Sequence, residues 1–263
     1  MATVMSASGS AGRWGPIWGA RPEDWAAIEE QQIRTYEEAI RRVGVPRGGR
    51  VLEVGCGSGV FLRAAADRGA QVSGLDASDA LLAIARARVP EADLRVADMQ
   101  FLPYEDDAFD LVAGFNSFFF AADMLAALRE AGRVAKPGAP VVIQVWGRPE
   151  RCDLTVLKDA LAPFLPPPPP GAPALWEAGV LESIAADAGL TPIRAFDAVW
   201  AFEFHDEETL ARQLRSAANA ELAARTAGEE PVRRAIVGAL ERFRTPAGTY
   251  RLENEWHYLH ASA

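Results

Sequence analysis

Between residues 45 and 147 the chain alternates short apolar runs with longer stretches whose apolar residues recur at helical spacing. The runs that are short enough to be buried strands lie at 50–54, 70–76, 93–97, 109–115 and 139–146. The stretches with helical spacing lie at 59–69, 78–89 and 123–138. Strands that alternate with helices predict an α/β fold with a doubly wound, mostly parallel sheet and helices on both faces.

Outside this region the pattern predicts a helix before the sheet and looser structure after it. Residues 21–44 have helical spacing, whereas residues 1–20 open with small polar side chains and predict a mobile tail. Beyond residue 147 we expect helices at 174–188 and 206–244, and strands at 192–204 and 250–260 that bring the sheet to seven. The five prolines at 166–170 impose an extended shape, as a stiff surface loop or the edge of a lid.

Composition narrows the classes of function. The chain has 263 residues, 49% hydrophobic and 24% charged, which is the balance of an ordinary globular protein. Its net charge of −9 argues against nucleic acid as a partner. Cys56 and Cys152 have neither a disulfide framework nor metal-ligand spacing, and no secretory signal or membrane span is evident. We therefore expect a cytoplasmic protein with no membrane partner and no metal site.

The stretch "VLEVGCGSG" (51–59) carries the main chemical signal. Gly55, Gly57 and Gly59 alternate between a strand and a helix, where a backbone without Cβ atoms can approach a ligand. A dinucleotide fingerprint would need its third glycine one position later, and a phosphate-binding loop would need a lysine. Glu53 immediately before the turn would repel a pyrophosphate and instead suits a ligand with positive charge.

This stretch closely resembles the first motif of the Rossmann-like (class I) methyltransferases that bind S-adenosyl-L-methionine, which carries a sulfonium and no phosphate. Asp76 matches the family's acid for the ribose hydroxyls, and Asp98 matches its acid for the adenine amino group. The resemblance implies a cofactor site formed by Glu53, Gly55, Cys56, Gly57, Gly59, Asp76, Ala77, Asp98, Met99 and Asn116. The likeness is closest to the small-molecule methyltransferases of ubiquinone and menaquinone biosynthesis.

The resemblance also divides the chain. It implies that residues 21–44 form a helix over the cofactor and that 45–147 are the cofactor-binding core. Residues 148–263 then supply the substrate-side helices and loops and the last two strands of the same sheet, the final one antiparallel. Apolar side chains where the family binds its acceptor predict an aromatic substrate site of Trp18, Trp25, Phe118, Phe119 and Trp146.

The catalytic residues stay unassigned. His205, His257 and His260 are the only histidines, and none lies in a family motif. No acid cluster follows the fourth strand to hold magnesium, because the next acid, Asp123, begins a helix. We therefore predict metal-independent, in-line methyl transfer to a small, largely apolar molecule.

Several alternatives stay open. A methyltransferase-like protein could bind the cofactor and catalyse a different reaction, such as cyclisation. A non-catalytic interaction module should have damaged cofactor motifs, and here they are intact. A dehydrogenase fits least, because the glycine spacing is wrong. The sequence leaves open the acceptor, whether O, N or C is methylated, and whether the chain forms a homodimer.

Overall fold

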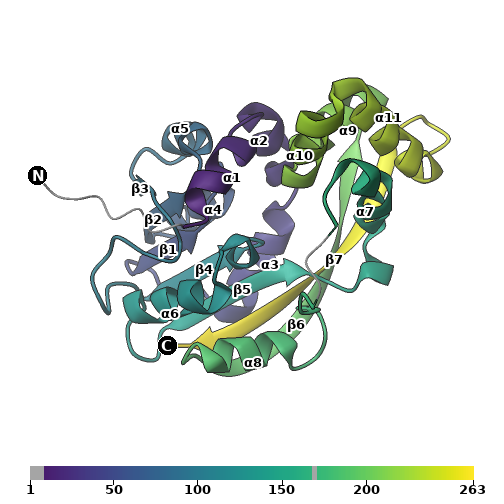
Figure 1. Cartoon of the computed structure of the whole chain (residues 1–263). Helices are drawn as coiled ribbons and strands as arrows, with labels where there is room; N and C mark the ends of the chain where they lie inside the picture. Colours follow the sequence, from purple (N-terminus) through teal and green to yellow (C-terminus); the bar gives the residue numbers. More distant parts are fainter. Residues whose placement is uncertain (1–8, 168–170) are drawn as a thin grey trace, which may run out of the picture.

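The computed structural model describes residues 9–167 and 171–263, which form a twisted seven-stranded sheet surrounded by helices (Figure 1). The strands are β1 (Arg50–Val54), β2 (Gln71–Asp76), β3 (Asp93–Val96), β4 (Leu111–Phe115), β5 (Pro140–Trp146), β6 (Thr191–Phe204) and β7 (Tyr250–Ser262). Their order across the sheet is β3-β2-β1-β4-β5-β7-β6. The last strand, β7, runs antiparallel to both of its neighbours, β5 and β6, and the other pairs are parallel, as expected. The predicted fold is confirmed.

The helices are α1 (Ala11–Trp18), α2 (Pro22–Glu30), α3 (Ile33–Val43), α4 (Val60–Ala66), α5 (Asp79–Arg88), α6 (Met124–Val134), α7 (Val156–Leu161), α8 (Val180–Asp187), α9 (Glu207–Leu214), α10 (Ala218–Ala227) and α11 (Glu229–Leu240). One hydrophobic core lies between the sheet and α3, α4 and α5, and it continues into α9, α10 and α11. A second core packs α6 and α8 against the other face. The strands β1, β4 and β5 are buried on both faces, which explains their continuous apolar sequences.

The strand order places a switch point between β1 and β4. The chain runs outward from β1 through β2 to β3, and then returns to the other side of β1 at β4. In doubly wound sheets ligands bind at such a point, beyond the carboxyl ends of the strands. The glycine turn follows β1 at this edge.

The N-terminal prediction is partly wrong. Residues 11–18 form helix α1, and Ile17 within it is 4% exposed, so this part of the predicted tail is packed on the protein. Residues 1–8 lie outside the described residues, as do residues 168–170 of the proline stretch. The predicted helix over 21–44 is two helices, because the chain turns at Gln31 and Gln32, where the amides bond three residues back.

The C-terminal helices also differ from their predicted bounds. The segment 206–244 contains α9, α10 and α11, and α10 ends where Gly228 takes a φ of 86° that a helix cannot continue. The predicted helix at 174–188 begins only at Val180, after Gly179 with a φ of 85°. None of the helices in the described ranges is long and apolar enough to cross a membrane.

Candidate cofactor and acceptor site

The turn between β1 and α4 requires glycine at three positions. Gly55, Gly57 and Gly59 have φ angles of 77°, 51° and 82°, in the left-handed region that favours glycine. Cβ atoms at these positions would meet, in turn, Ser117, Glu29 and Ala85. The alternating glycines therefore let side chains from three other parts of the chain pack directly on the turn.

Every backbone N–H of the turn donates within the protein. The amides of Gly55 and Cys56 both donate to the carbonyl oxygen of Leu75, at 2.8 and 2.9 Å. The amide of Gly57 donates to Asp76 Oδ2 at 3.0 Å, and that of Gly59 donates to the Cys56 carbonyl at 2.8 Å.

The remaining amide of the turn, that of Ser58, donates to Glu29 Oε2 at 2.8 Å. A phosphate site would need such N–H groups to point at the ligand. The N–H groups of this turn are not free to bind a phosphate. This agrees with the glycine spacing of the sequence, which does not fit a dinucleotide-binding motif.

Two acids stand at the carboxyl ends of β1 and β2: Glu53, which is buried, and Asp76, which is partly buried. Glu53 is 1% exposed, its Oε2 has no hydrogen-bond partner among the described residues, and burial raises its pKa well above the usual range. Burial also raises the pKa of Asp76, although the amides of Ser78 and Gly57 donate to its carboxylate and oppose the rise. Buried negative charge without a cation partner is costly, so these residues fit a ligand that carries positive charge.

Asp98, after β3, is held by the N-terminus of α1. The amide of Ala11 donates to Asp98 Oδ2 at 2.7 Å, and the Ser10 hydroxyl donates to the same oxygen at 3.2 Å. The amide of Gln100 donates to Oδ1 at 2.9 Å. Met99 beside it is partly buried against the second core. The predicted adenine end of the site therefore lies directly beneath the beginning of α1.

Glycines also bring α1 close to the loop that follows β2. A Cβ at Gly15 would lie less than 3.0 Å from the carbonyl oxygen of Ala77. A Cβ at Gly19 would lie 2.7 Å from the hydroxyl of Ser78. Ser78 also caps α5 as predicted, since its hydroxyl accepts from the amide of Leu81 at 3.2 Å. Helix α1 is therefore a cover whose backbone rests on the predicted cofactor residues.

Asn116 closes the site on the β4 side. It has a φ of 49°, and its backbone N–H donates to the backbone carbonyl oxygen of Gln144 at 3.0 Å. Its Oδ1 is buried and has no partner among the described residues. Like Glu53 Oε2, it is a polar atom at the switch point that the protein itself does not satisfy.

Five aromatic side chains form a cluster beside α1, which we call the aromatic cluster: Trp14, Trp18, Trp25, Phe119 and Phe120. Phe120 has edge contacts with Trp14 and Trp18, at ring-centroid distances of 4.9 and 5.4 Å. Trp18 also contacts Trp25, at 4.5 Å. Three of the predicted acceptor residues, Trp18, Trp25 and Phe119, thus belong to one cluster.

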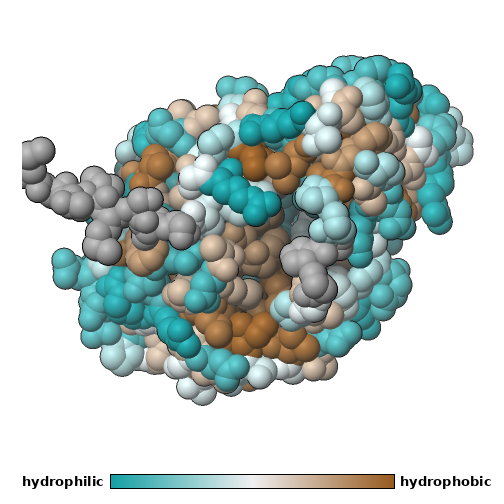
Figure 2. Space-filling model, in the orientation of Figure 1, coloured by the Kyte–Doolittle hydropathy of each residue, from teal (hydrophilic) through white to brown (hydrophobic). Residues whose placement is uncertain are grey.

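The other two predicted acceptor residues lie elsewhere. Phe118 is 1% exposed and belongs to the second core, where it packs over Gly114. Trp146, at the end of β5, stacks on Trp256 at 5.6 Å. Figure 2 shows that the face carrying α1, α6 and α10 is hollowed near its centre and that apolar side chains gather around the hollow.

The histidines differ in their surroundings. His205 is exposed, and burial lowers the pKa of the half-buried His260. His257 is 6% exposed, and its Nδ1 lies 2.7 Å from Asp197 Oδ1 across the β6–β7 pair. Its Nε2 has no partner among the described residues. Among the described residues, none of the three histidines forms a hydrogen bond with the glycine turn, and the catalytic residues stay unassigned.

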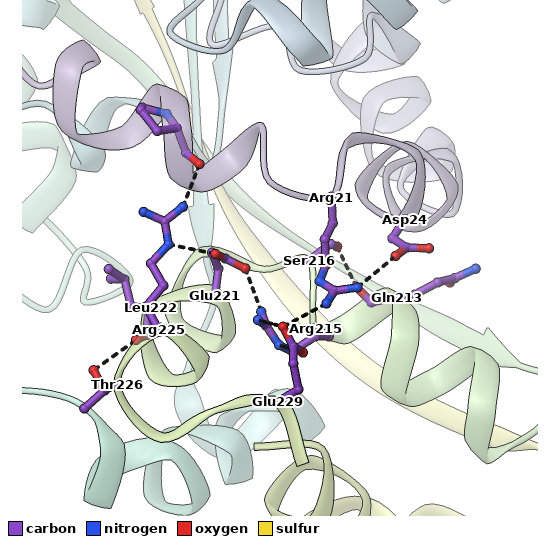
Figure 3. A network of polar contacts seen from close by, with 11 residues as sticks. Arg21, Asp24, Gln213, Arg215, Ser216, Glu221, Leu222, Arg225, Thr226 and Glu229 are labelled. Atoms are coloured by element: carbon purple, nitrogen blue, oxygen red, sulfur yellow. Dashed lines mark hydrogen bonds and ion pairs between the residues drawn. The ribbon is translucent and has the colours of Figure 1, made fainter. Parts of the chain in front are cut away.

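A network of ion pairs ties the cover to the helices between β6 and β7 (Figure 3). Arg215, whose side chain is 6% exposed, pairs with Glu221 at 2.9 Å and with Glu229 at 2.8 Å. Arg21, between α1 and α2, reaches the same Glu229 at 2.9 Å. One buried arginine thus links α9, α10 and α11 to the N-terminal segment.

Two further contacts strengthen this link. Arg225 on α10 donates to the carbonyl oxygen of Pro16 in α1 at 2.8 Å. Arg212 on α9 pairs with Asp24 on α2. Arg21, Pro16 and Asp24 thus each form a polar contact with the segment 207–240, and these three contacts hold α1 and α2 to that segment.

Glu29, Trp14 and Phe120 were not among the predicted site residues. Glu29 stands four positions after Trp25 and one after Ile28, on the buried stripe of α2, where a charged residue is unusual. A charged residue at a position where the helical spacing predicts an apolar one could have identified Glu29 as a candidate site residue. Trp14 lies four positions before Trp18, and Phe120 directly follows Phe119. Both become site candidates only through the ring contacts of Phe120 with Trp14 and Trp18.

A doubly wound sheet with a glycine turn after its first strand is a Rossmann-like fold, and here acids lie at or shortly after the ends of its first three strands. Residues 52–143 match the family described as a methyltransferase domain. This match confirms, over these residues, the resemblance to the S-adenosyl-L-methionine-dependent methyltransferases that the sequence motifs carry.

Individual relatives agree. Tocopherol O-methyltransferase of Arabidopsis thaliana is 30% identical over 66% of this chain and 53% of its own length. Ubiquinone biosynthesis O-methyltransferase of Alkalilimnicola ehrlichii is 33% identical over 55% of this chain and 59% of its own. The chain thus spans little more than half the length of these relatives.

Among solved structures, the cyclase SpnF has the same fold. Its TM-score is 0.55 with 22% identity, and the match covers 88% of this chain and 80% of that one. The fold is therefore shared by proteins with different reactions, and it does not by itself specify the chemistry.

Proposed function

We propose that the chain is an S-adenosyl-L-methionine-dependent methyltransferase that acts on a small, largely apolar acceptor by metal-independent, in-line transfer. One observation carries the proposal. The buried acid Glu53 and the partly buried acid Asp76 stand at the ends of β1 and β2, around a glycine turn whose N–H groups are all engaged within the protein. Such a site suits a nucleoside that carries positive charge and no phosphate.

The cofactor-binding roles follow the family resemblance. Asp76 would accept from the ribose hydroxyls and Asp98 from the adenine amino group, with Ala77 and Met99 beside the base. Asn116 would line the methionine end, where its Oδ1 lacks a partner among the described residues. When bound, S-adenosyl-L-methionine supplies an electrophilic methyl group. The protein then needs to align the acceptor and exclude water, which can supply several kcal/mol of rate enhancement.

The aromatic cluster is the proposed acceptor surface. Aromatic faces bind apolar molecules, and they attract a cation by roughly 1–2 kcal/mol when water is excluded. The two relatives described above are named as O-methyltransferases of tocopherol and of ubiquinone biosynthesis. We therefore place hydrophobic phenols first among the acceptors. Action on small molecules in the cytoplasm, rather than on nucleic acid, is part of the same proposal and agrees with the net charge of −9.

The test is incubation with methyl-labelled cofactor and a panel of hydrophobic phenols, amines and quinone precursors, followed by mass spectrometry. The proposal expects a labelled product and an equal amount of S-adenosylhomocysteine. A transformed product without S-adenosylhomocysteine would instead support the alternative, a cofactor-binding protein that catalyses a reaction such as cyclisation. Absence of cofactor binding in calorimetry would refute both.

A further inference from the structure

Glu29 reaches from the last turn of α2 into the glycine turn. Its side chain is 3% exposed, and its Oε2 accepts from the amide of Ser58 at 2.8 Å. The same oxygen lies 2.7 Å from the position of a Cβ on Gly57. The Ser58 amide thus holds Glu29 Oε2 against the glycine turn, beside the position of Gly57.

The groups that face Glu29 are mostly acidic. Glu53 on β1 and Asp76 on β2 are close enough to interact with its charge, as is the buried Tyr36 on α3. The one cation that acts on it is Arg88 of α5, which itself donates to the Ser58 carbonyl at 2.9 Å and pairs with Glu30 at 2.5 Å. Burial raises the pKa of Glu29 to about 7.

We propose that Glu29 is the third carboxylate of the cofactor site and that it binds the positive charge of the S-adenosyl-L-methionine sulfonium. This inference rests on the proposed function. The carboxylates of Glu29, Glu53 and Asp76, two of them buried and that of Asp76 partly buried, gather at one turn. None of the three forms an ion pair in the part of the chain that the structure describes. A buried oxygen of Glu53 has no hydrogen-bond donor there either. A bound cation would compensate this charge, whereas an uncharged ligand would not.

The charge of the ligand provides the test. S-adenosyl-L-methionine carries a sulfonium, and S-adenosylhomocysteine has a neutral thioether in its place but is otherwise alike. Titration calorimetry at pH 8.0 compares both ligands on the original protein, on Glu29→Gln and on the control Glu23→Gln. Gln keeps an acceptor for the Ser58 amide, and Glu23 lies on the same helix but is exposed.

We expect Glu29→Gln to weaken S-adenosyl-L-methionine by about tenfold or more, since a charge-assisted contact is lost. The same variant should weaken S-adenosylhomocysteine clearly less, and Glu23→Gln should change neither ligand appreciably. Near pH 7, binding of S-adenosyl-L-methionine should release a fraction of a proton from the original protein, because the cation lowers the pKa of Glu29. Titrations in two buffers of different ionisation enthalpy measure this release, which should be smaller in Glu29→Gln.

Three results would overturn the inference. Equal affinities of the original protein and Glu29→Gln for S-adenosyl-L-methionine would show that Glu29 does not contact the ligand. Equal weakening of both ligands would show a packing role without charge recognition. Proton release that is unchanged in the variant would assign the titration to another group. If the original protein binds neither ligand, the proposed function itself fails and this inference with it.

Discussion

The close approach of α1 to the cofactor residues can be tested at two glycines of the same helix. A Cβ at Gly15 would collide with the backbone carbonyl of Ala77, which cannot swing away as a side chain could. A Cβ at Gly12 would meet nothing within 4 Å. Both changes to Ala raise helix propensity by about 1 kcal/mol, so Gly12→Ala serves as a matched control for Gly15→Ala.

The size of the effect follows from what α1 holds in place. If Gly15→Ala forces the helix off its site, the buried side chain of Ile17 becomes exposed, which costs roughly 1.5–3 kcal/mol. The hydrogen bond from the Ala11 amide to Asp98 is lost as well. We expect Gly15→Ala to be less stable than Gly12→Ala by about 2 kcal/mol. For a protein of this size, that corresponds to a melting temperature roughly 4–8 °C lower.

Thermal unfolding monitored by circular dichroism measures this difference, and hydrogen exchange locates it. The amides of α1 should lose protection in Gly15→Ala and gain it in Gly12→Ala. Equal melting temperatures, or full protection of α1 in Gly15→Ala, would refute the reasoning, because the clash would then be absorbed without releasing the helix.

Four further predictions concern the site. Asp76→Ala should weaken S-adenosylhomocysteine roughly 10- to 100-fold in calorimetry. It should also reduce the free energy of unfolding by about 1–3 kcal/mol, because the buried amides of Gly57 and Ser78 lose their acceptor; unchanged affinity would remove Asp76 from the site. Since burial raises the Glu29 pKa from 4.5 to about 7, ionisation of Glu29 should destabilise the protein increasingly as pH rises from 4.5 to 7. The stability of Glu29→Gln relative to the original protein in urea titrations should therefore grow by up to about 3 kcal/mol over that window; a constant difference contradicts this. Phe118→Ala should reduce the free energy of unfolding by roughly 3–5 kcal/mol, whereas Phe119→Ala should mainly raise the KM for the acceptor, and the reverse pattern would exchange their roles. Turnover should be indifferent to EDTA, and activity lost in EDTA but restored by magnesium would disprove metal independence.

The sequence predicted the sheet well because its strands and helices bury whole faces, and burial leaves a clear periodic pattern. The acids at the strand ends could also be located, since each directly follows an apolar run. A helix that packs through its backbone, as α1 does at Gly15, leaves no periodic pattern of apolar side chains in the sequence. Residues 11–18 were predicted as part of a tail because the chain opens with small polar side chains, yet Gly15 is what lets α1 lie against the Ala77 carbonyl.

The site was less predictable where distant segments meet. Glu29 is one of several acids in its segment, and only the turn after α2 and the left-handed Gly57 bring its carboxylate to the Ser58 amide. The aromatic residues were recognisable as a group, but the ring contacts that separate Trp18 from Trp146 depend on where the helices pack.

Residues 205–249 are inserted between β6 and β7, so this segment could be exchanged as a unit without cutting the rest of the sheet. This segment leaves the sheet after β6 and returns at β7, and these two strands pair along thirteen residues of β7, so both ends of the segment are fixed by a long hairpin. Recombination with the corresponding segment of a relative would replace the helices beside α1 and leave residues 52–143 uncut. The salt links specify what such a graft must preserve. Arg215 and Glu229 would be transferred with this segment, and the recipient protein would need an arginine at the position of Arg21 to form the ion pair with Glu229.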